Sequence, residues 1–400
     1  MQAVTYKIKR AAAELGFSVT GITSAAPLVR DLATLHDWIG AGFAAGMDYM
    51  VRRPELKGQP RELVPYAASI ISLAVNYYSS APRFEHENRY GRIARYAWGL
   101  DYHEVVKPRL EQLARAIEHI LYDSARTNTG FRYRAFVDAV PLLERAVAER
   151  AGLGFFGKNT NLLQPKGGSW HFLAELLINA ELPEEGAPPK VSCGTCNRCL
   201  DACPTGAFAG PFKLDSRLCI SYLTIENKGA IPPELRPAIG AWLFGCDECQ
   251  DVCPFNRFSS ETNWPELRPE AGPGDRIDLA ELLSIDTDEK FRSRFKGTAL
   301  ARPKRRGLLR NAAVVAANIG CLTAIPALLE LIENDPEPLI RQHAIWAAAH
   351  LDKNMSRVVI EQAIKNDPDP SVRDEARACM ATGSIPLQSI CGLPPNDSIG

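Results

Sequence analysis

Apolar residues recur with a helical period in some parts of the chain and form strand-like runs in others. Val4, Ile8 and Leu15 lie three or four positions from other apolar residues, so residues 4–16 are expected to form a helix that Gly16 ends. The same spacing predicts further helices at 28–39, 107–124 and 141–152. Apolar or alternating runs predict strands at 17–25, 69–77, 131–140 and 170–179. This mixture of helices and strands indicates an α/β domain over residues 1–184.

From about residue 300 the pattern becomes purely helical and repeats itself. The run DPEPLIRQHA at 335–344 recurs as DPDPSVRDEA at 367–376, 32 residues later. An earlier copy has Arg310 and Ala313 where the later one has Arg341 and Ala344. A single repeat cannot bury its apolar face, whereas stacked repeats can, so residues 300–385 are expected to form HEAT-like helical repeats.

Between these two parts lie two dense groups of cysteines. The first follows the spacing C-x2-C-x2-C-x3-C and the second C-x2-C-x3-C, and a proline follows each. This is the bacterial ferredoxin spacing, in which the last cysteine of one run ligates the cluster of the other run. Residues 185–258 are therefore expected to form a ferredoxin-like domain with two [4Fe–4S] clusters. One cluster would be held by Cys193, Cys196, Cys199 and Cys253, and the other by Cys203, Cys219, Cys246 and Cys249.

Two other uses of these cysteines fit the sequence less well. Four cysteines within eleven residues are too dense for one tetrahedral zinc site. A disulfide framework is not needed, because a chain of 400 residues can bury a core without covalent staples. Cys321 and Cys379 occur among alanines in helical patterns and are expected to be small core residues.

Composition and charge add few constraints. The hydrophobic fraction of 46% and the charged fraction of 23% are typical of a water-soluble globular protein. The net charge of −1 gives the whole molecule no nucleic-acid signature, although a local basic patch remains compatible with it. No signal peptide or membrane-spanning run is present, and the cysteine usage fits a reducing compartment, so a cytoplasmic monomer is expected.

A basic segment precedes the first helical repeat. It contains Arg302, Lys304, Arg305, Arg306 and Arg310. Such a cluster is usually a solvated face, but beside helical repeats and a redox domain it also suggests contacts to nucleic-acid phosphates. The segment 259–299 before it is rich in proline and glycine and is expected to be a linker or surface crossing, and residues 386–400 a tail.

Several blocks of this sequence resemble the epoxyqueuosine reductase family, whose members complete queuosine synthesis in tRNA with cobalamin and iron–sulfur clusters. The blocks are VDAVPLLERAVAERAGLGFFGKN at 137–159, CGTCNRCLDACPTGAF at 193–208, CISYLTIENKG at 219–229 and GCDECQDVCPFN at 245–256. The resemblance covers nearly the whole chain. It implies that residues 1–184 bind cobalamin and carry the catalytic site, and that the partners are the anticodon stem-loop of tRNA and an external low-potential electron donor.

The resemblance also implies roles for individual residues. Asp138 would donate the proton to the substrate; the alternative is that it caps the following helix. An apolar cofactor face above it would raise the pKa of its carboxyl group. The positions that would line the corrin are Lys57, Ala94, Asp138, Leu162, Leu173, Ser221, Cys246 and Asp247, and Lys228 would contact tRNA.

Two other functions remain compatible with the cysteine pattern. A corrinoid reductive dehalogenase would share the cobalamin and the two clusters, but it leaves the helical repeats and the basic segment unexplained. A ferredoxin-type electron-carrier subunit would need no substrate of its own, and it leaves the α/β domain unexplained.

Overall fold

The computed structural model describes residues 2–80, 88–123, 130–184 and 186–381. Its N-terminal part contains a four-stranded sheet in the order β1-β2-β7-β4, and all three strand pairs are antiparallel. The strands are β1 (Val19–Ser24), β2 (Ser69–Asn76), β7 (His171–Ile178) and β4 (Tyr133–Phe136). The predicted mixture of helices and strands is confirmed, and β4 is shorter than the predicted strand at 131–140.

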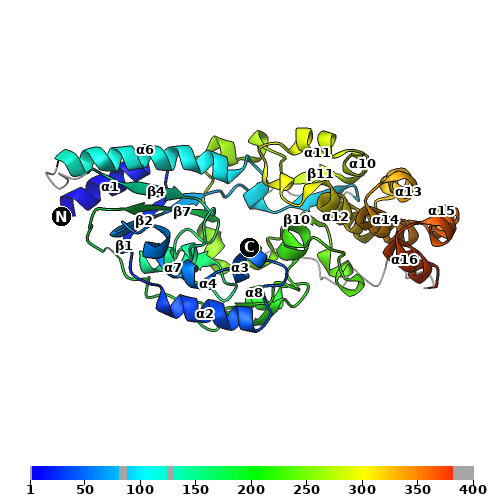
Figure 1. The fold of residues 1–400 in the computed structure, drawn as a ribbon, viewed down its shortest axis with the longest axis horizontal. Helices are drawn as coiled ribbons and strands as arrows, with labels where there is room; N and C mark the ends of the chain where they lie inside the picture. Colours follow the sequence, from blue (N-terminus) through cyan, green and yellow to red (C-terminus); the bar gives the residue numbers. More distant parts are fainter. Residues whose placement is uncertain (1, 81–87, 124–129, 185, 382–400) are drawn as a thin grey trace.

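Helices cover both faces of this sheet. The amphipathic helices α1 (Gln2–Glu14) and α6 (Tyr102–Asp123) lie together on one face, where they bury Leu73, Val75 and their neighbours (Figure 1). The other face carries α7 (Glu144–Arg150), and α2 (Val29–Gly40) lies beyond it. A side chain at Gly21 would meet the carbonyl oxygen of Ala151, so glycine there lets the end of α7 approach β1. Three short helices follow α2: α3 (Asp48–Val51), α4 (Pro54–Lys57) and α5 (Pro60–Leu63).

The segment between β4 and α7 differs from the prediction. The helix was expected to open at Pro141, but it begins at Glu144. Asp138 has a φ of 47°, in the left-handed region, which continues neither a strand nor a helix. Residues 137–143 therefore form a loop that carries Asp138.

A second sheet joins distant parts of the chain. It has the order β10-β3-β11, formed by β10 (Trp242–Phe244), β3 (Tyr90–Ile93) and β11 (Arg276–Asp278). Because β3 belongs to the N-terminal part and β10 to the cysteine-rich part, the expected boundary at residue 184 does not separate two independent cores. The expectation of a linker at 259–299 is wrong. This segment forms β11, α10 (Leu279–Leu283) and α11 (Asp288–Phe295) and buries apolar side chains such as Trp264.

The cysteine-rich part is built from short elements. These are α8 (Arg198–Asp201), α9 (Glu248–Asp251), the hairpin β8 (Phe208–Gly210) with β9 (Lys213–Leu214), and a π-helical turn at Tyr222–Glu226. A small hairpin of β5 (Phe155–Phe156) and β6 (Leu162–Leu163) precedes them. Helices α8 and α9, which carry cysteines of the two runs, contact each other.

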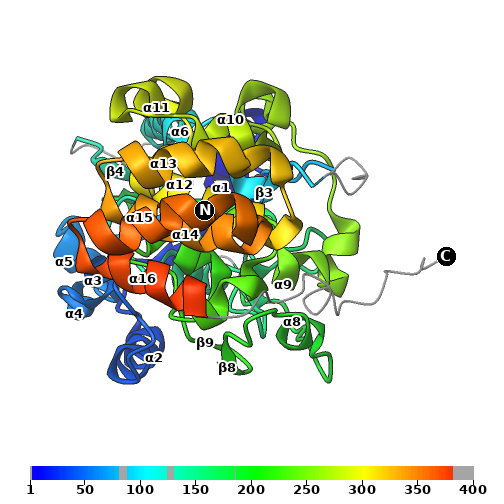
Figure 2. The same ribbon diagram turned by 90° about the vertical axis from the view of Figure 1, so that its right-hand side faces the viewer.

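The C-terminal helices stack as the repeat pattern predicts (Figure 2). They are α12 (Lys304–Ile319), α13 (Ile325–Asn334), α14 (Pro338–Leu351), α15 (Lys353–Asn366) and α16 (Pro370–Ala381). Arg341 pairs with Asp367 of the next repeat at 2.7 Å. The apolar core of these helices continues into β3 and β10, so the repeats are not a detached module. The expected tail at 386–400 lies outside the described residues. No helix among the described residues is long and apolar enough to cross a membrane.

Candidate functional site

The first group of thiols gathers around α8. Burial raises the pKa of Cys199 to about 11, and the charges of Cys253, Cys193 and Cys196 raise it further. The pKa of Cys253 is also raised by burial and then by Cys193 and Cys196. These four residues are therefore near neighbours, although Cys253 lies about fifty residues farther along the chain than the other three.

The second group gathers beside it. Burial raises the pKa of Cys219, Cys246 and Cys249, and the charge of Cys203 acts on both Cys219 and Cys249. Cys219 in turn raises the pKa of Cys246 and Cys249. The eight thiols therefore lie close together, and Cys199 of the first group also acts on Cys249 of the second. Over the described residues no three His, Cys, Asp or Glu side chains could share a single metal ion; a cubane cluster instead places each cysteine on a different iron.

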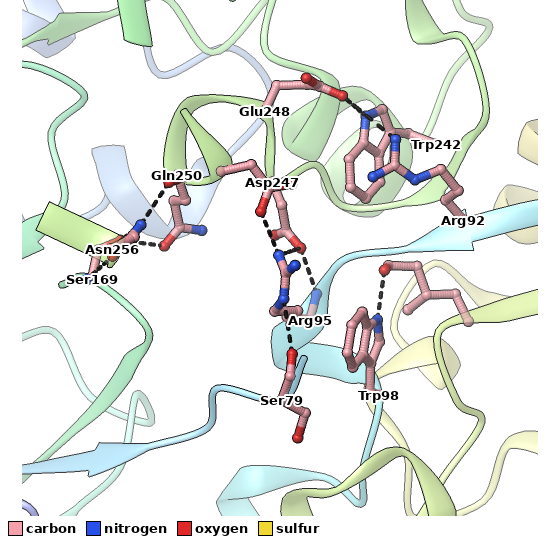
Figure 3. Close-up of polar contacts among 12 residues, drawn as sticks. Ser79, Arg92, Arg95, Trp98, Ser169, Trp242, Asp247, Glu248, Gln250 and Asn256 are labelled. Atoms are coloured by element: carbon pink, nitrogen blue, oxygen red, sulfur yellow. Dashed lines mark hydrogen bonds and ion pairs between the residues drawn. The ribbon is translucent and has the colours of Figure 1, made fainter. Parts of the chain in front are cut away.

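Arg95 connects the second cysteine group to the α/β domain (Figure 3). Its main-chain N–H donates to Asp247 at 2.8 Å, its Nη1 to Asp251 at 2.6 Å, and its Nε to the carbonyl oxygen of Ser79 at 3.1 Å. Burial and the charge of Asp251 raise the pKa of Asp247 to about 7. One guanidinium group therefore holds α9, which follows Cys246, against the end of β2.

Other polar contacts hold the chain around Cys246–Cys253 in place. Ser169 donates to Gln250 at 2.9 Å, and Asn256 donates to the carbonyl oxygen of Gln250 at 2.6 Å (Figure 3). Trp242 donates to Glu248 at 3.0 Å. The segment from Cys246 to Cys253 is thus held by Arg95 and Ser169 from the α/β domain and by Trp242 and Asn256 from the cysteine-rich part.

Asp138 lies exposed at the tip of its loop. Its Oδ2 accepts a hydrogen bond from the Tyr102 hydroxyl at 2.6 Å, and its N–H donates to Glu144 at 2.9 Å. Tyr102 stacks on Phe172 with ring centroids 4.1 Å apart. The alternative that Asp138 caps the following helix is wrong, because the N-cap of α7 is Leu143 and no side chain caps it. Tyr102 therefore holds the carboxyl group of Asp138 and Glu144 holds its main chain, while the side chain remains exposed.

A cavity opens next to this loop. Its volume is about 110 Å³. Its walls include two of the predicted corrin positions, Leu162 and Leu173, together with Tyr77, Arg145, Asn161, Gln164, Ser169, His171 and Gln250. Gln164 Nε2 and His171 Nδ1 are buried and have no hydrogen-bond partner within the described parts of the chain. Burial lowers the pKa of His171 to about 4, so its imidazole is neutral at pH 7.

The other predicted corrin positions lie in three further places. Ala94 contacts the cysteine run, because its N–H donates to the carbonyl oxygen of Phe244 and glycine at 245 leaves room for the Ala94 side chain. This contact brings Ala94 beside Cys246 and Asp247. Lys57 is buried, which lowers its pKa, and its carbonyl oxygen accepts from the N–H of Leu143 near the Asp138 loop. Ser221 is half-buried directly before the π-helical turn.

The basic segment divides into exposed and buried side chains. Arg302, Lys304, Arg306 and Lys228 are exposed, and Arg302 pairs with Glu226 at 2.6 Å. Arg305 is buried and pairs with Asp335. Arg310 is fully buried and donates to main-chain carbonyl oxygens. The prediction that Arg305 and Arg310 contact tRNA is therefore wrong, because both guanidinium groups are enclosed by protein.

Comparison with known families matches each part of the chain. Residues 57–139 match the family "Epoxyqueuosine reductase QueG, DUF1730", and residues 192–256 match the 4Fe-4S double cluster binding domain. Residues 299–381 match HEAT repeats. The second match establishes two [4Fe–4S] clusters as cofactors of the cysteine-rich part.

Similarity to individual proteins extends over most of the chain. An epoxyqueuosine reductase from Pseudomonas aeruginosa is 43% identical over 340 residues, which cover 84% of this chain and 91% of the relative. The chain belongs to the epoxyqueuosine reductase family. The Escherichia coli epoxyqueuosine reductase is 37% identical over 89% of this chain and 91% of its own.

Solved structures of epoxyqueuosine reductases superpose on the chain as a whole. One, in complex with an epoxyqueuosine-modified tRNA-Tyr stem loop, has a TM-score of 0.84 at 32% identity and covers 95% of this chain and 98% of that one. The Bacillus subtilis enzyme, in a structure described as having an aspartate catalytic loop swung out of the active site, has a TM-score of 0.84 at 31% identity, with the same coverage.

The structure places near Asp138 and the second cysteine group residues that the sequence analysis missed. Arg95 lies in a segment to which it gave no role, and Glu144 and Arg145 lie within the block 137–159, where only Asp138 was singled out. Glu175 gave a clearer signal, because an acidic residue interrupts an otherwise apolar strand. Tyr102 carried no recognisable motif.

Proposed function

We propose that the protein reduces epoxyqueuosine in tRNA to queuosine, using two [4Fe–4S] clusters and cobalamin. The observation that carries this proposal is the position of Asp138, a held yet exposed carboxyl group beside a cavity with unpartnered polar groups. The reaction removes the epoxide oxygen: the substrate takes up two electrons and two protons and yields an alkene and water. An external low-potential donor supplies the electrons, and the protein acts as a monomer.

The cavity suits an edge of a corrin. Leu162 and Leu173 provide an apolar wall, and the unpartnered nitrogens of Gln164 and His171 suit the amide side chains around the ring. Cobalamin, when bound, would supply the reducing centre that acts on the epoxide. Lys57, Ala94, Ser221, Cys246 and Asp247 would complete its site.

The two cysteine groups would form the path of the electrons. We assign Cys193, Cys196, Cys199 and Cys253 to one cluster and Cys203, Cys219, Cys246 and Cys249 to the other. The second group shares its segment with Asp247, whose charge acts on Tyr77 in the wall of the cavity. The second cluster would therefore be the one nearer the substrate, and the first would accept electrons from the donor.

Asp138 would protonate the oxygen that leaves the substrate carbon. The hydrogen bond from Tyr102 and the N–H donated to Glu144 fix the direction of the carboxyl group. The modified base would have to leave the anticodon stack to reach this group, as enzymes that act on bases generally require.

The exposed cations would bind the tRNA backbone. Arg302, Lys304 and Arg306 lie around the first turn of α12, where the positive end of the helix dipole adds to their charge. Arg302 also lies near the catalytic loop, because Asp138 and Glu226 both raise its pKa. A phosphate held there and at Lys228 would bring the anticodon loop to Asp138.

The test is conversion of substrate by the reconstituted protein. Protein with both clusters and cobalamin is reduced and incubated with tRNA that contains epoxyqueuosine, and the nucleosides are analysed by mass spectrometry. The expected product is lighter than the substrate by one oxygen atom. Absence of this product from protein loaded with all cofactors would refute the proposal.

A further inference from the structure

Glu175 is an acidic residue inside the central sheet. It lies in β7 opposite Ser72 of β2 and Phe136 of β4, and its side chain is 0% exposed. Ser72 donates to its Oε1 at 3.2 Å. Its Oε2 has no donor partner within the described residues. A carboxylate in such a place is costly unless something neutralises its charge.

The group that faces Glu175 is a second carboxyl group. Glu144, the first residue of α7, is close enough for the charge of Glu175 to raise its pKa, and it accepts the N–H of Asp138. Two neighbouring carboxyl groups repel each other unless one of them carries a proton. Burial raises the pKa of both, that of Glu175 to about 8. The pair therefore holds a proton at neutral pH, directly behind the loop that carries Asp138.

The charged groups around the pair do not replace this proton. From α7, Arg145 lies near Asp138 and Glu144, but its Nη1 donates to the carbonyl oxygen of Thr160 at 2.6 Å. From α6, Tyr102 donates to Asp138. The remaining titratable groups whose pKa Asp138 affects from neighbouring elements are His103, Tyr49, Tyr96 and Arg302. None of these residues forms an ion pair with Glu144 or Glu175 in the described chain.

The proposed reaction needs such a proton. It consumes two protons, and a single carboxyl group such as that of Asp138 can donate only one at a time. We propose that the Glu144–Glu175 pair stores the second proton and returns it to Asp138 after the first transfer. Asp138 first protonates the departing oxygen and becomes a carboxylate. The pair then gives up its proton to Asp138, which completes the water molecule. Solvent reprotonates the pair between turnovers, and the two electrons come from the external donor.

This inference deepens the proposed function and depends on it, so one measurement is independent of activity. Infrared spectroscopy of the folded protein detects the C=O stretch of a protonated carboxyl group. We expect a band that persists at pH 7, disappears as the pH rises through about 8, and is absent from Glu175→Gln. Absence of such a band from the wild-type protein overturns the inference, whatever the enzyme does.

The kinetic test uses neutral variants of similar shape. Glu175→Gln and Glu144→Gln keep a hydrogen-bonding side chain but store no exchangeable proton of this kind. We expect kcat to fall about 100-fold with KM unchanged, as for loss of an acid in proton transfer. The decline of the wild-type rate above about pH 8 should also disappear. A wild-type kcat and pH profile in both variants overturns the inference.

Glu149→Gln is the matched control. Glu149 lies on the same helix, is also buried, and pairs with Arg30 away from Asp138. We expect this variant to keep the wild-type pH profile. If wild-type protein converts no substrate while the titrating band is present, the proposed function fails and the proton-holding pair stands. If Glu175→Gln does not fold, Glu144→Gln and the wild-type infrared titration decide the question.

Discussion

Substitution of Arg310 tests how the helical repeats support the redox centre. Its guanidinium group is fully buried and forms no ion pair with a carboxylate of residues 2–80, 88–123, 130–184 or 186–381. It donates to the carbonyl oxygens of Leu223 at 2.7 Å, Asn227 at 2.7 Å and Gly229 at 2.8 Å. These acceptors belong to the segment that follows Cys219 and carries Lys228. A helix of the repeats therefore fixes the path of a chain segment next to the second cluster.

The energies of charge burial and hydrogen bonding predict an unusual order of stability for two variants of Arg310. Burial lowers the pKa of Arg310 from 12.5 to about 9, which corresponds to a cost of about 5 kcal/mol for the buried charge. Of the hydrogen bonds that its guanidinium group donates, the three to these main-chain carbonyl oxygens contribute about 5–9 kcal/mol against it, and two more go to Oδ1 of Asn311. Arg310→Met loses these bonds but also removes the buried charge, so we expect a net loss of about 2 kcal/mol.

Arg310→Lys keeps the positive charge but has a single ammonium nitrogen in place of the three guanidinium nitrogens. It retains about one of the three bonds and loses about 3–6 kcal/mol. We therefore expect lysine, the chemically closer residue, to destabilise the protein more than methionine does.

Chemical unfolding of the reconstituted protein measures this order. The midpoint should fall for Arg310→Met and fall further for Arg310→Lys, and both variants should lose iron from the second cluster and affinity for tRNA. Arg373→Met is the control, because Arg373 occupies the matching place in a later repeat and contacts only its own turn, through the carbonyl oxygens of Asp367 and Pro368. Equal stability of Arg310→Lys and the wild type would refute the reasoning.

Three further outcomes are expected. Asp138→Asn should retain both clusters and cobalamin but form no product, as measured by absorbance spectra and nucleoside analysis; unimpaired turnover would remove Asp138 from the mechanism. Cys219→Ala should lose one of the two clusters and about half of the iron, measured by iron analysis and electron paramagnetic resonance, because it removes a ligand of one cluster only; a full iron content would contradict the ligand assignment. Lys228→Ala should weaken tRNA binding at low salt and reduce its salt dependence, because it removes one phosphate contact; an unchanged salt dependence would count against that contact.

Most of the fold followed from local patterns. The helices and strands of the N-terminal part, the cysteine spacing and the repeats all produce periodic signals within short windows. The sheet of β10, β3 and β11 could not be predicted from such signals, because its strands are three or four residues long and come from distant segments. The segment 259–299 failed for a related reason: its prolines begin short 3-10 turns rather than an extended linker.

The candidate site could be predicted less well from the sequence, because the role of a charged residue depends on whether the fold exposes or encloses its side chain. Arg302 and Arg310 look alike in the sequence, yet one is exposed and the other is enclosed. The alignment of the repeats, however, already suggested that Arg310 is buried. Arg310 occupies the place of Arg341, which in the later repeat is buried and pairs with Asp367. A repeat position that turns inward in one copy is expected to turn inward in the others.

The buried position of Arg310 also indicates that the helical repeats help to hold the segments around the second cysteine group. Had they been a separate RNA-binding module, deleting them would remove tRNA binding and leave the redox centre intact. Instead Asn311, the next residue, donates to the carbonyl oxygens of Thr224 at 2.7 Å and Leu243 at 3.0 Å, on the two segments that lead to and from the second cysteine group. Arg302 at the start of the same helix pairs with Glu226 in the π-helical turn. A tRNA phosphate bound at Arg302, as proposed, would therefore rest on the turn that follows Cys219, and the proposed substrate-binding surface and electron path would share one structural element.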